Sequence, residues 1–164
     1  MKTIEAVTEI HAPVQAVWAE LSAVSTYPAW NPFITTFKGE LVVGHRVEVR
    51  IAPPGARPMT FRPTITAVEE GRRLEWLGRL LVPGVFDGRH SFHLEDLGQG
   101  WTRLTQSESF SGVLVALTSK TLERTREGFE AMNQAVRLRA ETATATPATT
   151  ATPTTTPTPT PNDR

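Results

Sequence analysis

Six consecutive runs of strand-forming residues are the feature that most constrains how this chain can fold. They lie between residues 36 and 111. Turn residues separate them, as in PPGARP (53–58) and VPG (82–84). Consecutive strands at hairpin spacing pair with their neighbours in the chain. The runs therefore predict an antiparallel sheet.

Helical patterns flank these runs. Residues 3–12 predict one more strand, and the apolar spacing after Pro13 predicts a first helix. Two prolines in residues 25–34 leave room for only one short helical turn. From 113 to about 140, apolar residues recur every three or four positions with charges between them, which predicts a long amphipathic helix. The expected fold class is α+β, a seven-stranded curved antiparallel sheet wrapped around a long C-terminal helix, with two short helical segments after the first strand.

The end of the chain has a different composition. Residues 142–164 are almost entirely Thr, Pro and Ala. Such a segment buries too little apolar surface to offset the entropy lost on ordering. We therefore expect one domain over residues 1–141 and a disordered tail over residues 142–164.

The charge balance and the missing cysteines exclude several classes of function. The 17 basic and 17 acidic residues give zero net charge, so nothing indicates binding to nucleic acid or to an anionic membrane. The absence of cysteine excludes disulfides, thiol nucleophiles and cysteine-based zinc sites. Glu5 and Glu9 interrupt the apolar run that a signal peptide needs, and no stretch is long enough to span a membrane. We expect a cytoplasmic protein.

Three stretches carry a resemblance to a known superfamily: TYPAWNPF (26–33), RLEWLGRLLVPGVFDGRHSF (73–92) and TRLTQSESFSG (102–112). Through them and the order of its elements, the chain resembles the SRPBCC superfamily over residues 3–140. That superfamily has the helix-grip fold and includes birch-pollen-allergen, START lipid-transfer and polyketide-cyclase proteins. The bacterial polyketide cyclase/dehydrase-like branch is the most similar. Because the superfamily contains both carriers and enzymes, the resemblance does not select between them.

Strand parity decides which histidine faces the long helix. In residues 86–94 the even positions are apolar except for His90. Because side chains alternate between the two faces of a strand, His90 should point inward and His93 into solvent. These two histidines therefore cannot share a metal, and His11 and His45 show no ligand spacing. No metal site is expected.

The hairpin around residues 82–84 predicts cross-strand neighbours. It would place Trp76 opposite His90 and Gly78 opposite Gly88. Two inward glycines either only let the sheet bend or also leave an unfilled volume. We expect a cavity as well as a bend, because the neighbouring inward residues are polar.

The next turn, near Gly98, sets His90 opposite Gln106, and a register shift of two residues would set it opposite Glu108. In either register the three polar side chains meet on one inner patch. A packed core rarely holds such groups unless they satisfy one another or a ligand. A self-satisfied polar cluster and a ligand site both remain open.

The expected site is a largely apolar cavity with a few orienting polar groups, as is usual for small-molecule pockets. His90, Gln106 and Glu108 would orient a hydroxyl, carbonyl or amine of a small hydrophobic or amphipathic ligand, with lipids included. The residues predicted to form the site are Trp76, Gly78, Gly88, His90, Phe92, Leu104, Gln106, Glu108, Phe110, Leu117, Thr121 and Phe129.

Binding of a small hydrophobic molecule is the expected function. One alternative is a cyclase or dehydratase acting on a polyketide-like or aromatic substrate, with His90 as general acid or base and Glu108 acting on it. Another is a protein-interaction domain, similar to the heat-shock-ATPase activators, which are co-chaperones of the same superfamily. The sequence contains no nucleophile elbow, phosphate loop or dinucleotide fingerprint, so no cofactor is expected. Neither catalytic turnover nor the oligomeric state follows from the sequence.

Overall fold

A computed structural model describes residues 1–80, 86–111 and 119–145. The chain begins with strand β1 (Lys2–Ile10), helix α1 (Val14–Ser22), the short 3₁₀ helix η1 (Val24–Thr26) and helix α2 (Tyr27–Trp30). The strands that follow are β2 (Ile34–Lys38), β3 (Glu48–Ile51), β4 (Met59–Phe61), β5 (Thr64–Glu69), β6 (Arg73–Leu80), β7 (Phe86–Gly98) and β8 (Trp101–Ser111). Helix α3 (Ser119–Ala145) ends the described chain.

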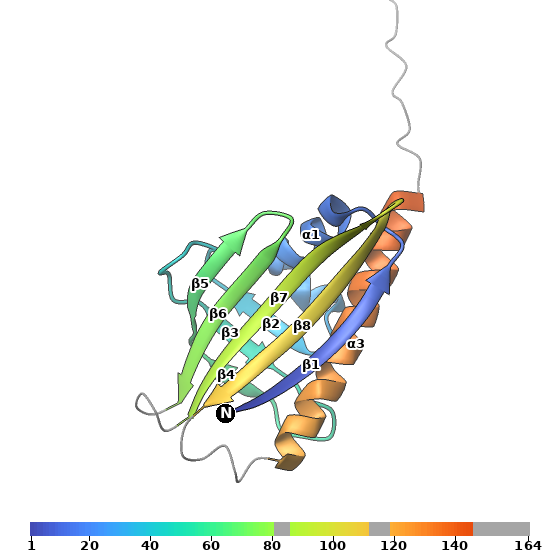
Figure 1. The fold of residues 1–164 in the computed structure, drawn as a ribbon. Coiled ribbons are helices and arrows are strands. Elements are labelled where there is room, and N and C mark those ends of the chain that lie inside the picture. The colour runs from blue at the N-terminus through green and yellow to red at the C-terminus, as the bar shows by residue number, and fades with distance from the viewer. Residues whose placement is uncertain (81–85, 112–118, 146–164) are drawn as a thin grey trace, which may run out of the picture.

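The fold class is α+β, as predicted, with a curved antiparallel sheet and a long C-terminal helix (Figure 1). The strands form two sheets. The main sheet has five strands in the order β1-β8-β7-β6-β5, and the small sheet has three in the order β2-β3-β4. All pairings are antiparallel.

The prediction of a single seven-stranded sheet was wrong in its strand count. Residues 59–70 were expected to form one strand, but the chain breaks after Phe61 and moves from the small sheet to the main sheet. Pro63 lies at this break, and a proline cannot donate the N–H that would continue a ladder. The two sheets meet at the bridge between Arg46 and Thr64.

Helix α3 packs beside β1 and contacts β8 and α1. Its buried positions recur every three or four residues, which confirms the predicted amphipathic pattern; they include Leu122, Thr125, Phe129, Met132, Val136 and Ala140. The predicted start at residue 113 lies outside the described residues. The helix continues to Ala145.

The pairing of β6 with β7 has the predicted register. Trp76 lies opposite His90, and Gly78 lies opposite Gly88. His90 is only 4% exposed, whereas His93 lies on the exposed outer face. Strand parity was therefore sufficient to separate the two histidines.

The pairing of β7 with β8 follows the alternative register, in which His90 lies opposite Glu108. The expected turn centre near Gly98 was wrong. The loop is Gln99-Gly100, whose positive φ angles of 52° and 78° suit a two-residue hairpin turn. A bulge between Asp96 and Gly98 completes the change of register.

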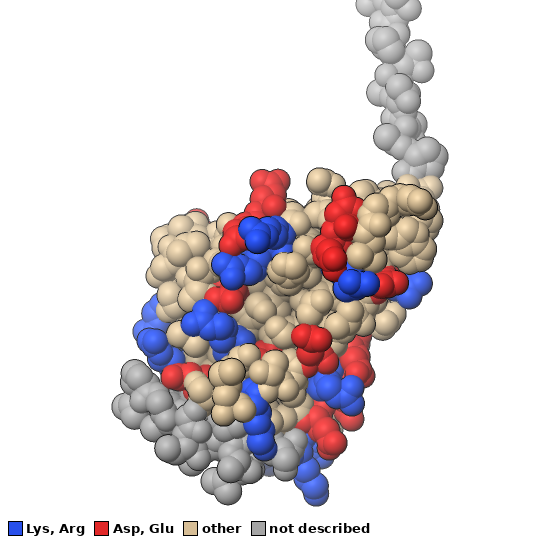
Figure 2. Space-filling model, in the orientation of Figure 1, with Lys and Arg blue, Asp and Glu red and all other residues tan. Residues whose placement is uncertain are grey.

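Charges of both signs are interspersed over the face shown in Figure 2. On the outer side of the main sheet, Arg103 donates hydrogen bonds of 2.9 Å to Glu9 and to Glu95. The hydrogen bond to Glu9 is the largest cause of the raised pKa of the Arg103 guanidinium, and the hydrogen bond to Glu95 is the next largest. In the described part of the chain, no helix combines the length and apolar character needed to cross a membrane.

Candidate functional site

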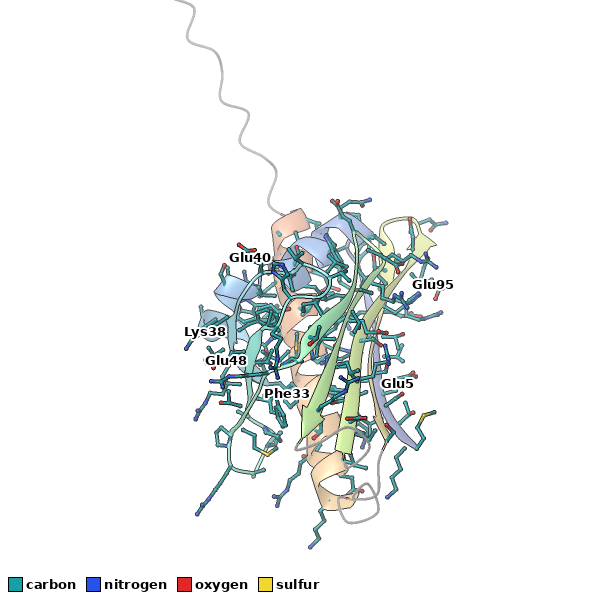
Figure 3. All side chains as sticks on the ribbon, turned by 90° about the vertical axis from the view of Figure 1, so that its left-hand side faces the viewer. Glu5, Phe33, Lys38, Glu40, Glu48 and Glu95 are labelled. Atoms are coloured by element: carbon teal, nitrogen blue, oxygen red, sulfur yellow. The ribbon has the colours of Figure 1, made fainter. Side chains whose placement is uncertain are left out.

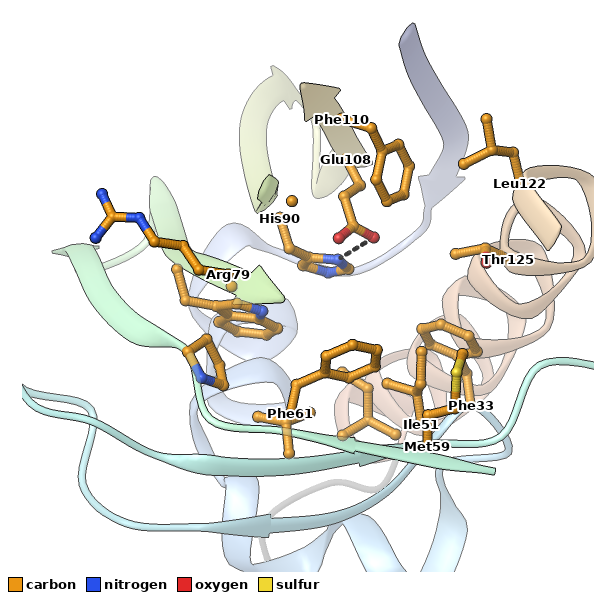
Figure 4. Close-up of a pocket in the computed structure, with 16 residues that line it drawn as sticks. Phe33, Ile51, Met59, Phe61, Arg79, His90, Glu108, Phe110, Leu122 and Thr125 are labelled. Atoms are coloured by element: carbon orange, nitrogen blue, oxygen red, sulfur yellow. Dashed lines mark ion pairs between the residues drawn. The ribbon is translucent and has the colours of Figure 1, made fainter. Parts of the chain in front are cut away.

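A pocket lies between the main sheet, the small sheet and α3 (Figure 4). Its cavity volume is about 90 Å³. A single water molecule needs only roughly 10–15 Å³ measured in this way, so there is room for several. The lining residues are Phe33, Ile34, Val49, Ile51, Met59, Phe61, Pro63, Trp76, Gly78, Arg79, Gly88, His90, Glu108, Phe110, Leu122 and Thr125.

The small sheet supplies one apolar wall of this pocket. Val49 and Ile51 come from β3, and Met59 and Phe61 from β4. This wall was not predicted, because every strand was expected to lie in one sheet. The spacing of two within each pair was an available signal, since such residues share one face of a strand.

Phe33 forms part of the wall beside α3 and lies between the two sheets in Figure 3. Asn31 fixes the chain just before β2, because its side-chain oxygen accepts hydrogen bonds from the backbone N–H groups of Phe33 (3.0 Å) and Ile34 (2.8 Å). The Phe33 ring packs against Gly128, where a β-carbon would overlap the ring. Phe33 therefore reaches its position only because α3 has a glycine there.

His90 forms the floor at the polar end. Its ring stacks on Trp76 with 4.7 Å between centroids and a 3° interplanar angle. The edges of Phe92 and Phe129 pack around it, each with its ring centroid 4.9 Å from that of His90. Aromatic neighbours on several sides leave the imidazole little freedom to rotate.

The two ring nitrogens of His90 face different neighbours. The side-chain amide of Gln106 lies 3.3 Å from His90 Nε2, and Gln106 is fully buried. Nδ1 faces Glu108 Oε2 at 3.7 Å, along the dashed line in Figure 4. Glu108, His90 and Gln106 thus form a chain that leads from the pocket into the core.

Gly88 makes room for the carboxylate of Glu108. A β-carbon at position 88 would lie 2.5 Å from Glu108 Oε1, whereas a β-carbon at Gly78 would meet nothing closer than 3.7 Å. The two glycines therefore differ. The space above Gly88 holds the end of a neighbouring side chain, and the space above Gly78 is open to the pocket.

The structure brings half of the predicted site residues to the pocket. Those that line it are Trp76, Gly78, Gly88, His90, Glu108 and Phe110. Four others do not line it: Phe92, Leu104, Gln106 and Phe129 are fully buried. Phe92, Leu104 and Gln106 face inward as predicted but lie further along the sheet, and Phe129 lies on α3 in the hydrophobic core. Leu117 and the side chain of Thr121 lie outside the described residues.

Within the described residues, no group of three His, Asp or Glu side chains is arranged to hold a metal ion. His90 and His93 lie on opposite faces of β7. The site is instead an apolar pocket with one carboxylate and one imidazole at its inner end.

A curved antiparallel sheet, a long C-terminal helix packed against it and a pocket between them define a helix-grip protein. Residues 1–152 match the family described as polyketide cyclase / dehydrase and lipid transport, and the chain belongs to this family. No curated protein matches the sequence.

Solved structures support the fold assignment. A hypothetical protein from Helicobacter pylori is similar, with a TM-score of 0.70, 16% identity and coverage of 85% of this chain and 88% of its own. A norcoclaurine synthase from Thalictrum flavum gives a TM-score of 0.67, 15% identity and coverage of 87% and 96%. A protein from Mesorhizobium loti gives 0.66, 17% identity and coverage of 86% and 98%. At such identities the similarity establishes the fold alone.

Proposed function

We propose that this protein binds a small, largely hydrophobic molecule in the pocket between the two sheets and α3. The observation that carries the proposal is an apolar, aromatic-walled pocket with two polar side chains, His90 and Glu108, at its inner end. Pockets for small molecules combine apolar walls with a few polar groups that fix orientation. The family description, which includes lipid transport, is consistent with such a ligand.

The size of the pocket narrows the class of ligand. Pockets that enclose drug-sized molecules span roughly 300–1,000 Å³, and this one is about 90 Å³. A ligand with a single small ring fits this volume better than an extended acyl chain. The mouth includes Met59, whose side chain is 38% exposed, so a longer substituent could leave the pocket there.

Gly78→Leu provides a direct test. A side chain at this position would enter open space without an initial clash, so the fold should be retained while the pocket is filled. Thr105→Leu is the matched control, because it adds the same side chain to the outer face of β8. Titration calorimetry with ethylbenzene should show binding to the wild type and the control and none to Gly78→Leu. Equal binding by all three proteins would contradict the proposal.

A second candidate function is a cyclase or dehydratase-type enzyme. It is favoured by the chain formed by Glu108, His90 and Gln106, because an imidazole, the commonest general acid or base, lies 3.7 Å from a carboxylate that borders the pocket. A solved structure with the same fold is a synthase bound to a transition-state analogue. Turnover of a polyketide-like or aromatic substrate by the wild type, lost in His90→Phe and retained in His93→Ala, would establish this function.

No observation favours the protein-interaction alternative. Among the described residues, the exposed large apolar side chains are Met1, Val7, Val42, Val43, Met59, Leu97, Trp101 and Leu138, and nothing shows them to form one surface. A docking surface of this kind would require one contiguous patch.

A further inference from the structure

The polar end of the pocket presents an acceptor rather than a donor. Both ring nitrogens of His90 are directed at protein groups, Nε2 at Gln106 and Nδ1 at Glu108. Trp76 covers one face of the imidazole. A ligand can therefore meet the edge of this ring, and the polar atoms beside the ring that border the pocket are the carboxylate oxygens of Glu108, with Thr125 as a further polar lining residue.

Glu108 has unused hydrogen-bonding capacity. Its side chain is 19% exposed, and within the described part of the chain its carboxylate accepts no hydrogen bond. The 3.7 Å between Oε2 and His90 Nδ1 is too long for one. A largely buried carboxylate normally has several donors, which is how its charge is compensated. The group that faces this carboxylate across the pocket should therefore be a donor.

The charges around the pocket favour a cationic donor. The second charged lining residue, Arg79, has a side chain that is 56% exposed and lies 3.9 Å from Asp87 on the neighbouring strand. In Figure 4 its guanidinium points away from the pocket. Glu108 therefore leaves the inner end of the pocket negative.

The walls favour the same type of ligand. Phe33, Phe61, Trp76 and Phe110 all line the pocket, and aromatic faces attract cations that lie within about 6 Å of the ring centroid. A carboxylate in a pocket lined by aromatic rings is a site for an ammonium group. An anion would meet both the carboxylate and the negative ring faces.

We propose that the ligand is a protonated amine on a compact, ring-sized apolar skeleton, with Glu108 accepting its hydrogen bond. His90 is a positioning residue that holds the carboxylate from behind. This inference rests on the proposed function, because it names the chemistry of the molecule that occupies the same pocket.

Four probe ligands of similar size show whether the pocket prefers a cationic, a neutral polar, an apolar or an anionic ligand. Benzylamine, benzyl alcohol and ethylbenzene have equal numbers of non-hydrogen atoms and differ in one terminal group, and benzoate adds an anion. Titration calorimetry at neutral pH and low salt should give an affinity for benzylamine at least about tenfold higher than for ethylbenzene, since hydrogen bonds to charged groups are the strong ones. Benzyl alcohol should lie between them, and benzoate should not bind.

Variants test whether the carboxylate of Glu108 causes the preference for benzylamine over ethylbenzene. Glu108→Gln keeps the shape of the side chain and removes its charge, so it should abolish the preference for benzylamine while ethylbenzene still binds. Glu5→Gln is the matched control, because Glu5 projects from the outer face of β1 (Figure 3). His90→Phe should reduce the benzylamine-to-ethylbenzene ratio severalfold without loss of ethylbenzene binding, which a purely structural role would not predict.

The outcomes distinguish a failure of the amine inference from a failure of the proposed binding function. If ethylbenzene binds as tightly as benzylamine to the wild type, the protein is a binder of apolar rings and the amine inference is wrong. Tightest binding of benzoate would also overturn the inference and would indicate Arg79 as the anchor. If no probe binds, both the inference and the proposed binding function fail. These results come from the wild type and do not depend on the folding of any variant.

Discussion

Replacing Gly128 with Ala should destabilise this protein, although the same change in the middle of a helix is normally stabilising. Gly128 lies on the buried face of α3 against the Phe33 ring. Phe33 is 2% exposed and packs edge-on against Phe129, with 5.3 Å between ring centroids. A β-carbon at position 128 would overlap ring atoms close to the base of Phe33, where the side chain cannot swing away.

Two opposing contributions set the magnitude. Alanine is favoured over glycine in a helix interior by about 1 kcal/mol. Overpacking a filled core costs about 1–3 kcal/mol, and the direct overlap with a buried ring puts this site toward the upper end. The net loss should be about 1–2 kcal/mol, which for a domain of this size lowers the melting temperature by roughly 3–6 °C.

Denaturant and thermal unfolding of Gly128→Ala, Phe33→Leu and the double variant would test this account. In the Phe33→Leu background the ring is absent, so Gly128→Ala should become neutral or stabilising, and the double-mutant cycle should show coupling between the two positions. A rise in the stability of the Gly128→Ala variant alone, or two effects that simply add, would refute the reasoning.

Three further outcomes are expected. Gly88→Ala should displace the carboxylate of Glu108, which would lie 2.5 Å from the new β-carbon, and calorimetry should show a smaller preference for benzylamine with ethylbenzene binding retained. Tyr27 is buried and donates a 2.6 Å hydrogen bond to the carbonyl of Leu21, and burial, followed by the charge of Glu20, raises its pKa. Because the unfolded phenol ionises near pH 10, the stability that Tyr27 contributes is complete below that pH and is lost as the pH rises above it. Urea unfolding between about pH 9 and pH 11 should show this loss in the wild type and a flatter profile in Tyr27→Phe, and identical profiles would contradict it. Deleting residues 146–164 removes almost only Thr, Pro and Ala and should leave the melting temperature and ring binding unchanged, so a clear fall in either would show that this segment docks.

The sequence by itself determined the element types and the inner face of the main sheet. The alternation in β7 separated His90 from His93, because the two-residue period of a strand is a local property. The hairpin predicted from the sequence around residues 82–84 gave the register that places Trp76 opposite His90, and the pairing of β6 with β7 confirms that register. Both features depend on residues close together in the chain, and so they could be predicted.

The β7–β8 register could not be fixed in the same way. Asp96 to Gly100 offers more than one place for a turn, and the alternatives differ by a bulge that local propensity does not select. The choice decides whether Gln106 or Glu108 lies opposite His90. Only the packing of the whole sheet settles it, and as a result Glu108 reaches the pocket while Gln106 is buried behind the imidazole.

The residues that form the pocket wall opposite His90 were likewise decided by the tertiary structure. Parity shows that a residue faces inward, but not whether a neighbour fills the space in front of it, so Phe92 and Phe110 could not be separated into core and pocket. The contact of Phe33 with Gly128 joins positions 95 residues apart in the chain, and no local pattern indicates it. Pro63 could have signalled the break that the prediction missed, but the move of β5 into the main sheet depends on long-range pairing. The sequence thus defined the inner surface of the sheet, and the packing of the small sheet and α3 decided which part of that surface remained open as a pocket.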